Sequence, residues 1–155
     1  MELTFAPKDI LQINDARIIH RNFEGRGSQY NREGDRNFSI VIPTQEMADE
    51  LIARGWNVKI KDGRDEGDDP FIFLPVKVSF NGYGPAVYLQ SGNRRVELDE
   101  ETVKCLDDID IIGADMDIRP YDWGPINGKY GRSAYLQSIR VHQRIDRFAA
   151  EDQQL

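Results

Sequence analysis

The sequence predicts a mainly β fold: a compact Greek-key β-barrel with short helical inserts, with a β-sandwich as the alternative. Six to eight short runs rich in β-branched and aromatic residues follow one another at close spacing, separated by Gly, Asn and Pro. Only two short stretches have the character of a helix. A chain of 155 residues is long enough for one domain to bury a core without disulfides.

The first two strands are expected on either side of a long loop. Residues 12–23 (QINDARIIHRNF) mix β-branched and polar residues, whereas residues 37–42 (NFSIVI) form a clearer strand that Pro43 ends. Residues 24–36 contain three glycines among polar side chains, so we expect a flexible loop there.

A short helix and a third strand follow. Thr44 can cap a helix over residues 45–54, whose apolar residues recur on one face, and Gly55 stands just past its end. Residues 56–61 (WNVKIK) predict a short strand with alternating lysines.

The second half of the chain has the turn chemistry of successive hairpins. Residues 62–70 (DGRDEGDDP) are too charged and too rich in Gly to be anything but an exposed loop. Residues 71–80 form a strand in which Pro75 predicts a bulge or an edge position. Further along lie a hairpin of residues 86–90 and 95–98, a short helix over residues 99–106, and a final hairpin of residues 116–121 and 133–142.

The chain is expected to hold one domain. Residues 1–143 form the β-barrel, and residues 144–155 form a short C-terminal helix and acidic tail. No apolar run approaches the roughly 20 residues of a spanning helix, and the N-terminus lacks the apolar core of a secretory signal. Cys105 is the only cysteine, which excludes an intrachain disulfide and favours a cytoplasmic protein.

Charge is segregated along the chain, although the formal net charge is −7. Residues 54–64 carry four cations against one acid, and residues 119–144 carry five against one. Residues 97–117, by contrast, carry nine carboxylates against Lys104. Such a protein does not coat a polyanion with its whole surface, but it can bind one at a single basic face.

Three stretches combine aromatic side chains with cations: residues 26–38, 56–61 and 119–135. Bases stack on aromatic rings and phosphates pair with Lys and Arg, so this combination favours binding of single-stranded nucleic acid. Residues two apart on a strand share a face, so Arg119 is expected to point the same way as Tyr121. The candidate nucleic-acid-binding residues are Arg32, Arg36, Phe38, Lys59, Lys61, Arg119, Tyr121, Trp123, Lys129, Tyr130, Arg132 and Tyr135.

An aromatic residue on a strand is more often part of the core than of a binding face. The ordinary expectation is therefore burial of Phe38, Phe71, Phe73, Phe80 and Trp56. Phe38 is both a candidate binding residue and an expected core residue, so the exposure of its side chain decides between the two interpretations.

Motifs for catalysis are absent from the sequence: there is no phosphate-binding glycine loop, no nucleophile elbow and no zinc-protease motif. An acidic cluster could hold Mg²⁺ in a nuclease, but a solvated acidic surface is the better interpretation of its pattern. We expect no enzymatic activity, no cofactor and no metal. The cluster consists of Asp107, Asp108, Asp110, Asp115 and Asp117.

Two stretches resemble a known family. The run GKYGRSAYLQSIRV at residues 128–141, after RPYDW at residues 119–123, is similar to the final hairpin of single-stranded DNA-binding proteins of bacteriophages and prophages. Residues 28–43 (SQYNREGDRNFSIVIP) resemble a recurring N-terminal element of phage-related proteins of this size.

This resemblance implies a barrel of the oligonucleotide-binding type and sequence-tolerant binding of single-stranded DNA during replication or recombination in the bacterial host cell. It implies replication or recombination proteins as partners and leaves a homodimer open. Many such proteins end in an acidic tail that recruits enzymes, whereas here the tail is short and ends on Leu155. By motif match, binding roles fall on Tyr121, Trp123, Lys129, Arg132 and Tyr135, and less directly on Arg32, Arg36 and Phe38.

Two alternatives from other functional classes stay open at this point. The first is a phage structural or protein-interaction module, which a flat exposed apolar patch without a positive groove would favour. The second is a metal-dependent nuclease that uses the acidic cluster.

Overall fold

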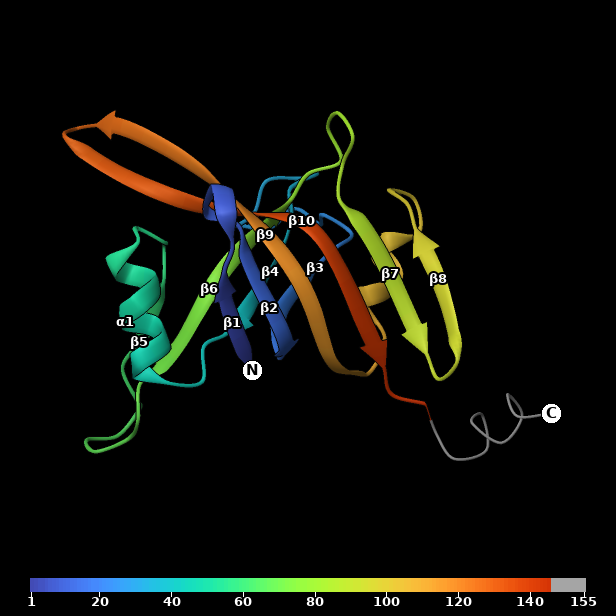
Figure 1. Ribbon diagram of the computed structural model, residues 1–155, viewed down its shortest axis with the longest axis horizontal. Coiled ribbons are helices and arrows are strands. Elements are labelled where there is room, and N and C mark those ends of the chain that lie inside the picture. Colours follow the sequence, from blue (N-terminus) through green and yellow to red (C-terminus); the bar gives the residue numbers. More distant parts are fainter. Residues whose placement is uncertain (146–155) are drawn as a thin grey trace.

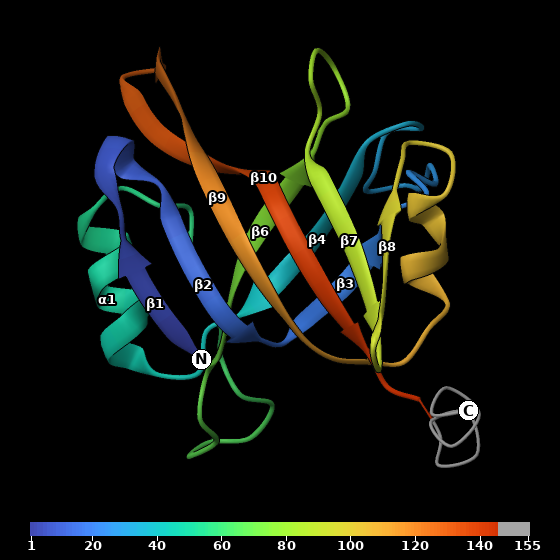
Figure 2. The ribbon, with the colours of Figure 1, turned by 45° about the vertical axis from the view of Figure 1, so that its right-hand side comes forward.

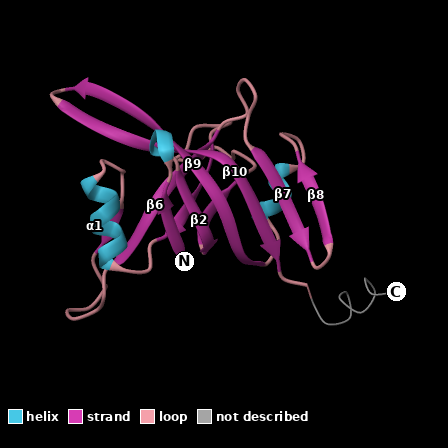
Figure 3. Ribbon diagram, viewed as in Figure 1, coloured by secondary structure: helices cyan, strands magenta, loops and turns pink. Residues whose placement is uncertain are grey.

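The computed structural model describes residues 1–145, and their strands join in one ten-stranded sheet (Figures 1 and 3). The C-terminal helix and tail expected at residues 144–155 lie, from residue 146 onward, outside the described residues. The strands are β1 (Glu2–Phe5), β2 (Leu11–Ala16), β3 (Ile18–Asn22), β4 (Arg36–Val41), β5 (Lys59–Lys61), β6 (Phe71–Val78), β7 (Ala86–Ser91), β8 (Arg94–Leu98), β9 (Ile111–Ile126) and β10 (Lys129–Gln143).

The predicted mainly β class is confirmed, but the sheet is open and does not form a closed barrel. Its main path runs β1-β2-β9-β10-β6-β4-β3, with β5 paired to β6, β7 paired to β10 and β8 paired to β7. Figure 2 shows β6, β4 and β3 crossing behind β2, β9 and β10. The two halves enclose the core without a ladder that joins β1 to β3.

The strand expected at residues 12–23 is in fact two strands, β2 and β3, with only Arg17 between them. β2 pairs with β9 and β3 pairs with β4. Both ladders contain a register shift, and Asp15 and His20 have positive φ angles of 53° and 54° at these points. Irregularities of this kind bend a strand sharply, so the chain leaves one half of the sheet and enters the other.

The core lies between the two halves and is formed by side chains that alternate along the strands. It includes Leu11, Ile13, Phe38, Ile40, Leu74, Val76, Ile118, Leu136 and Ile139, all at most 2 % exposed. Phe38 and Trp56 are core residues as expected. Phe73 is buried as expected, although it lies outside the main core cluster, whereas Phe71 is exposed and Phe80 is half-buried.

The predicted helix is α1 (Gln45–Ala53), and the residues expected to begin and end it are in place. The Thr44 Oγ1 accepts a hydrogen bond from the backbone N–H of Met47 at 3.2 Å, which satisfies one of the free donors of the first turn. Gly55 follows the helix with φ of 89°, a conformation that favours glycine. No helix among residues 1–145 is long and apolar enough to cross a membrane.

Pro75 does not interrupt its strand, and β6 (Phe71–Val78) runs through it. On one side, Pro75 lies opposite Ser39 of β4 in an unbroken register. On the other side, the pairing with β5 ends at Phe73 and the pairing with β10 begins at Val76. Pro75 lies in the gap between those two ladders, where no neighbouring strand needs its missing N–H.

Several boundaries also differ from the predictions. The third strand begins at Lys59 rather than Trp56, and β1 was not expected at all. The predicted helix over residues 99–106 is a 3-10 turn, η2 (Val103–Asp107), and a second such turn, η1 (Pro7–Asp9), joins β1 to β2. The final hairpin is longer than predicted, because β9 and β10 extend well beyond the body to a turn at Asn127–Gly128 (Figure 1).

Candidate nucleic-acid interface

A row of polar side chains crosses four strands on the outer face of the sheet. Arg119 of β9 lies opposite Tyr135 of β10, which lies beside Lys77 of β6, which lies opposite Asn37 of β4. Residues paired in this way project on the same face. This face is the outer one, because the sequence neighbours Ala134, Val76 and Phe38 point to the opposite face and belong to the core.

Tyr135 is the centre of this row. Its half-buried ring has the Arg119 guanidinium carbon 5.0 Å from its centroid and the Lys77 ammonium nitrogen 5.7 Å away. The Tyr121 ring meets it edge-on at a centroid distance of 5.8 Å. Within residues 1–145, neither Arg119 nor Lys77 has a carboxylate partner. Both cations are therefore free to meet an anion beside the ring.

A groove of about 550 Å³ lies on this face. It is bounded by the loop before β4, by the three central strands and by the start of the loop after β6, so segments distant in sequence form one cavity. Its lining includes Asn31, Asp35, Arg36, Asn37, Ser39, Asn57, Pro75, Lys77, Phe80, Asn81, Glu100, Ser133 and Tyr135.

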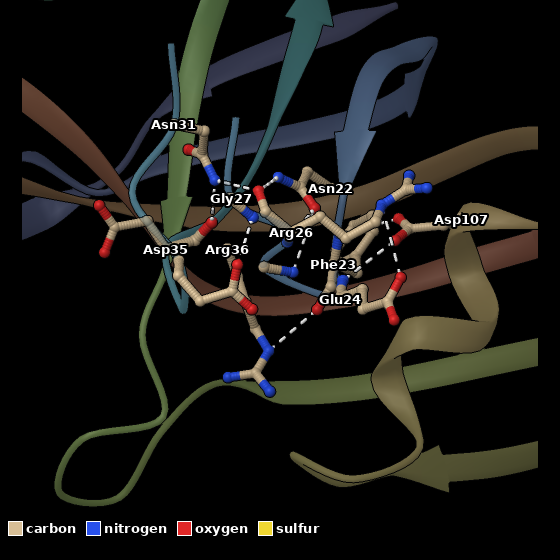
Figure 4. A network of polar contacts seen from close by, with 11 residues as sticks. Asn22, Phe23, Glu24, Arg26, Gly27, Asn31, Asp35, Arg36 and Asp107 are labelled. Atoms are coloured by element: carbon tan, nitrogen blue, oxygen red, sulfur yellow. Dashed lines mark hydrogen bonds and ion pairs between the residues drawn. The ribbon is translucent and has the colours of Figure 1, made fainter. Parts of the chain in front are cut away.

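The loop between β3 and β4 is held by a network of side-chain hydrogen bonds (Figure 4), although residues 24–36 were expected to be flexible. The Asn22 Oδ1 accepts from the backbone N–H groups of Gly25 and Arg26, at 3.1 and 2.9 Å. The Asn31 Nδ2 donates to the carbonyls of Arg26 and Asp35, at 2.8 and 3.0 Å. These polar side chains thus pair with the loop backbone and give the groove an ordered wall.

Asp107, one of the acidic cluster, also holds this loop. Its two carboxylate oxygens accept from the backbone N–H groups of Phe23 and Glu24, at 2.8 and 3.0 Å. Asp115 has different partners, namely the Asp15 N–H at 2.9 Å and the side chains of Arg140 and His142. Among the described residues, no three acidic, His or Cys side chains converge as a metal site would require. Asp107 and Asp115 therefore make separate structural contacts.

Arg36 and Phe38 are engaged within the protein. The Arg36 Nε donates to the Phe23 carbonyl at 2.9 Å, and its guanidinium lies 3.4 Å from a Glu100 carboxylate oxygen and 5.4 Å from the Phe80 ring centroid. Phe38 is 1 % exposed and stacks on Phe23. The candidate role of Phe38 in stacking a base is corrected, since its ring faces the core.

Arg132 points to the face opposite Tyr135 and is fully engaged. Its Nε and Nη2 meet the two Asp122 carboxylate oxygens at 2.7 and 3.1 Å, and Nη2 lies 3.4 Å from Asp9. Its guanidinium also lies over the Trp56 ring at 5.4 Å. Hydrogen bonding between Arg132 and Asp122 raises the pKa of Arg132 and lowers the pKa of Asp122. Arg132 therefore braces the hairpin in this structure, and its predicted phosphate contact stays a prediction.

The β9–β10 hairpin brings the remaining candidates together. Trp123 lies opposite Gly131, and a side chain at position 131 would clash with the Trp123 indole. Glycine is needed there because the indole lies flat on the backbone. Tyr121 and Tyr130 are 55 % and 75 % exposed. Lys129 is also exposed near the tip, as is Arg32 in the loop before β4.

Lys59 and Lys61 are on the same outer face as Lys77. They lie opposite Phe73 and Phe71 of β6, which alternate with Lys77 along one face of that strand. The short strand β5 does not pair with β10 through a ladder, but Trp56 forms an isolated bridge with Arg132. Strand β6 therefore lies between the basic residues of β5 and those of the β9–β10 hairpin. Nothing in the sequence indicated this arrangement.

Lys77 and Asn37 are candidate interface residues that the sequence reasoning missed. Lys77 stands in an apolar run (FLPVKVSF), and a single charged residue at an alternate position of such a run is a signal for an outward-facing position. The candidate role of Lys77 in DNA binding depends on its position beside Tyr135, which is 58 positions later in the sequence. No local pattern indicates that pairing.

Comparison with known families decides what this chain is. The family model described as "Putative phage ssDNA-binding domain" matches residues 2–153. The chain belongs to this family of phage single-stranded DNA-binding domains. The family resemblance found in the sequence is thereby confirmed. No curated protein matches the chain.

The fold agrees with that of solved structures from bacteriophage Enc34. The single-stranded DNA-binding protein of Enc34 superposes with a TM-score of 0.58 at 13 % identity, covering 94 % of this chain and 92 % of that one. The same Enc34 protein in complex with ssDNA gives a TM-score of 0.56 at 17 % identity, covering 93 % and 92 %. Identity this low shows a shared fold alone.

Proposed function

We propose that this phage single-stranded DNA-binding domain holds the strand on the outer face around Tyr135, with little dependence on base sequence, during phage or prophage replication or recombination. The proposal is supported by one observation above all: Tyr135 stands between two cations that lack carboxylate partners among residues 1–145. A base stacks on the ring while its flanking phosphates reach Arg119 and Lys77.

The residue roles are revised from those inferred in sequence. Arg119, Tyr121 and Tyr135 meet DNA directly, together with Lys77 and Asn37. The hairpin tip, with Trp123, Lys129 and Tyr130, covers the strand from one side, and Arg32 approaches it from the loop before β4. Lys59 and Lys61 extend the basic surface along β6. Arg36 and Arg132 position the loop and the hairpin.

The arrangement supports an oligonucleotide-binding type of fold, although the sheet is open. The bent segment β2–β3 contributes to both halves of the sheet, and the β9–β10 hairpin stands beside the groove. In such folds, the strand face and the adjoining loops bind oligonucleotides. A flat apolar patch would instead have favoured a protein-interaction module, whereas the groove lies among polar residues and cations.

Binding to labelled oligo-dT at several salt concentrations tests the function. We expect micromolar or tighter dissociation constants at low salt, a steep fall in affinity with added salt, and weaker binding to duplex of the same length. Substitution of Lys104, an exposed lysine within the acidic segment, is the matched control. Absence of binding to single strands at low salt would overturn the proposal.

A further inference from the structure

A second aromatic cluster lies on the outer face, farther along β6 from the Tyr135 row. Alternation places Phe71, Phe73, Pro75 and Lys77 on one face, and the register of β6 against β4 and β5 is unbroken over this stretch. Phe73 is 8 % exposed but does not belong to the core cluster. Phe71 is 38 % exposed. These two rings therefore lie on the same outer face of the sheet as Tyr135 and Lys77.

The contacts of Phe73 explain why it is buried on an outer face. The Phe71 ring lies 5.6 Å from it, and the His20 ring meets it edge-on at 5.0 Å. The Lys61 ammonium lies 5.7 Å from its centroid. Phe73 forms the floor of the cluster, and Phe71 leaves part of its ring open to solvent.

Charge on this cluster matches that of the Tyr135 row. Lys59 and Lys61 are exposed, and neither has a carboxylate partner in the part of the chain that the structure describes. An exposed ring beside unpaired ammonium groups is the combination that binds a base and its phosphates. The cluster thus repeats the chemistry of Tyr135 with Arg119 and Lys77.

We propose that Phe71 is a second base-stacking subsite, at which Lys59 and Lys61 meet the phosphates of the same single strand; this inference rests on the proposed function. Phe71 and Lys77 are six residues apart along β6, about 20 Å at the rise of a strand. About six nucleotides at the 3.4 Å spacing of stacked bases cover that length.

The loop after β5 limits how far the proposed DNA path along β6 extends beyond Phe71. Residues 62–70 begin directly after Lys61 and carry five carboxylates against Arg64. Their field repels phosphates, so the strand is expected to leave the surface at Phe71. The resulting site of about six nucleotides lies within the usual range of about 4–16 for an oligonucleotide-binding fold.

The test compares Phe71→Ala, Phe71→Leu and Phe71→Tyr in the full chain, using oligo-dT of increasing length. We expect Phe71→Ala and Phe71→Leu to weaken binding of an eight-nucleotide strand by about 5- to 150-fold, because neither side chain offers a ring. Phe71→Tyr should bind like the wild type. Ile112→Ala, which removes another exposed apolar side chain, is the control and should change nothing.

A second readout is the length at which affinity stops rising, which we expect to be shorter in Phe71→Ala. A double Lys59→Ala, Lys61→Ala variant, which leaves the core intact, should lower the salt slope by about 2. If the wild type binds but Phe71→Ala or Phe71→Leu binds equally well, the subsite is overturned and the proposed function stands. If the double lysine variant keeps the full slope, the phosphate contacts are overturned. If the wild type binds no single strand, both proposals fail.

Discussion

Arg119 and Tyr135 face each other across the β9–β10 ladder, with the guanidinium carbon 5.0 Å from the ring centroid. The contact keeps a cation and an aromatic ring together on the outer face of the sheet, although 15 residues of the hairpin lie between them in sequence. Lys77 approaches the same ring from β6. Tyr135 therefore connects the hairpin to the body of the sheet.

Tyr135→Ala is expected to weaken binding of oligo-dT by about 5- to 150-fold, the cost of losing one stacked base. Tyr135→Phe should bind nearly as well as the wild type, because stacking uses the ring and not the hydroxyl. Fluorescence anisotropy measures both. Tyr88→Ala is the control, since Tyr88 also lies beside a cation, Arg95, but outside the groove. Equal affinities for Tyr135→Ala and the wild type would contradict this role.

Lys77→Ala should weaken binding to all single strands alike and reduce the slope of log affinity against log salt by about 1, because one phosphate contact is lost. Lys104→Ala should leave the slope unchanged. The measurement is a salt titration with oligo-dT and with a strand of mixed sequence. A loss confined to one base sequence would show that Lys77 reads bases instead of phosphates.

Arg132→Ala should reduce the free energy of unfolding by about 1–2 kcal/mol, because two charge-assisted hydrogen bonds to Asp122 are lost. Arg132→Lys should not restore this stability, since an ammonium group cannot make the bidentate contact. Chemical denaturation measures the effect, with Arg94→Ala as an exposed control. The salt slope of DNA binding should stay that of the wild type, and a slope lowered by about 1 would mean that Arg132 meets phosphate after all.

Asp115 makes the fold sensitive to acid. Burial raises its pKa, but hydrogen bonds from Asp15, His142 and Arg140 outweigh this and lower the pKa from 3.8 to about 2. A lowered folded-state pKa adds stability above the unfolded value of 3.8 that is lost as pH falls toward 2. Since the side chain is 22 % exposed, solvent screening leaves about 1–2 kcal/mol of this contribution.

Asp115→Asn tests this assignment. The variant should be less stable than the wild type at pH 7 by about 1–2 kcal/mol, and the difference should shrink as pH falls from 4 to 2. Urea denaturation across that range measures it, with Asp108→Asn, an exposed neighbour in sequence, as the control. A difference that stays constant with pH would show that the carboxylate charge does not stabilise the fold.

The sequence by itself determined the mainly β class, the helix with its Thr44 cap, the family and the hairpin that holds Tyr135. These follow from local causes: alternation, turn residues, capping and short motifs act over a few neighbouring positions. Local signals also separated basic from acidic segments. They do not determine which strands pair.

Only the tertiary structure decided which cations lie beside Tyr135 without a carboxylate partner among residues 1–145. The sequence singled out Arg132 and not Lys77, yet Arg132 meets Asp122 and Asp9, whereas Lys77 stands beside Tyr135 without a carboxylate partner among residues 1–145. A one-residue change of register reverses the face of every side chain on a strand, and register depends on pairing with distant segments. For the same reason, Phe38 lies in the core while Phe71, expected there, lies on the outer face.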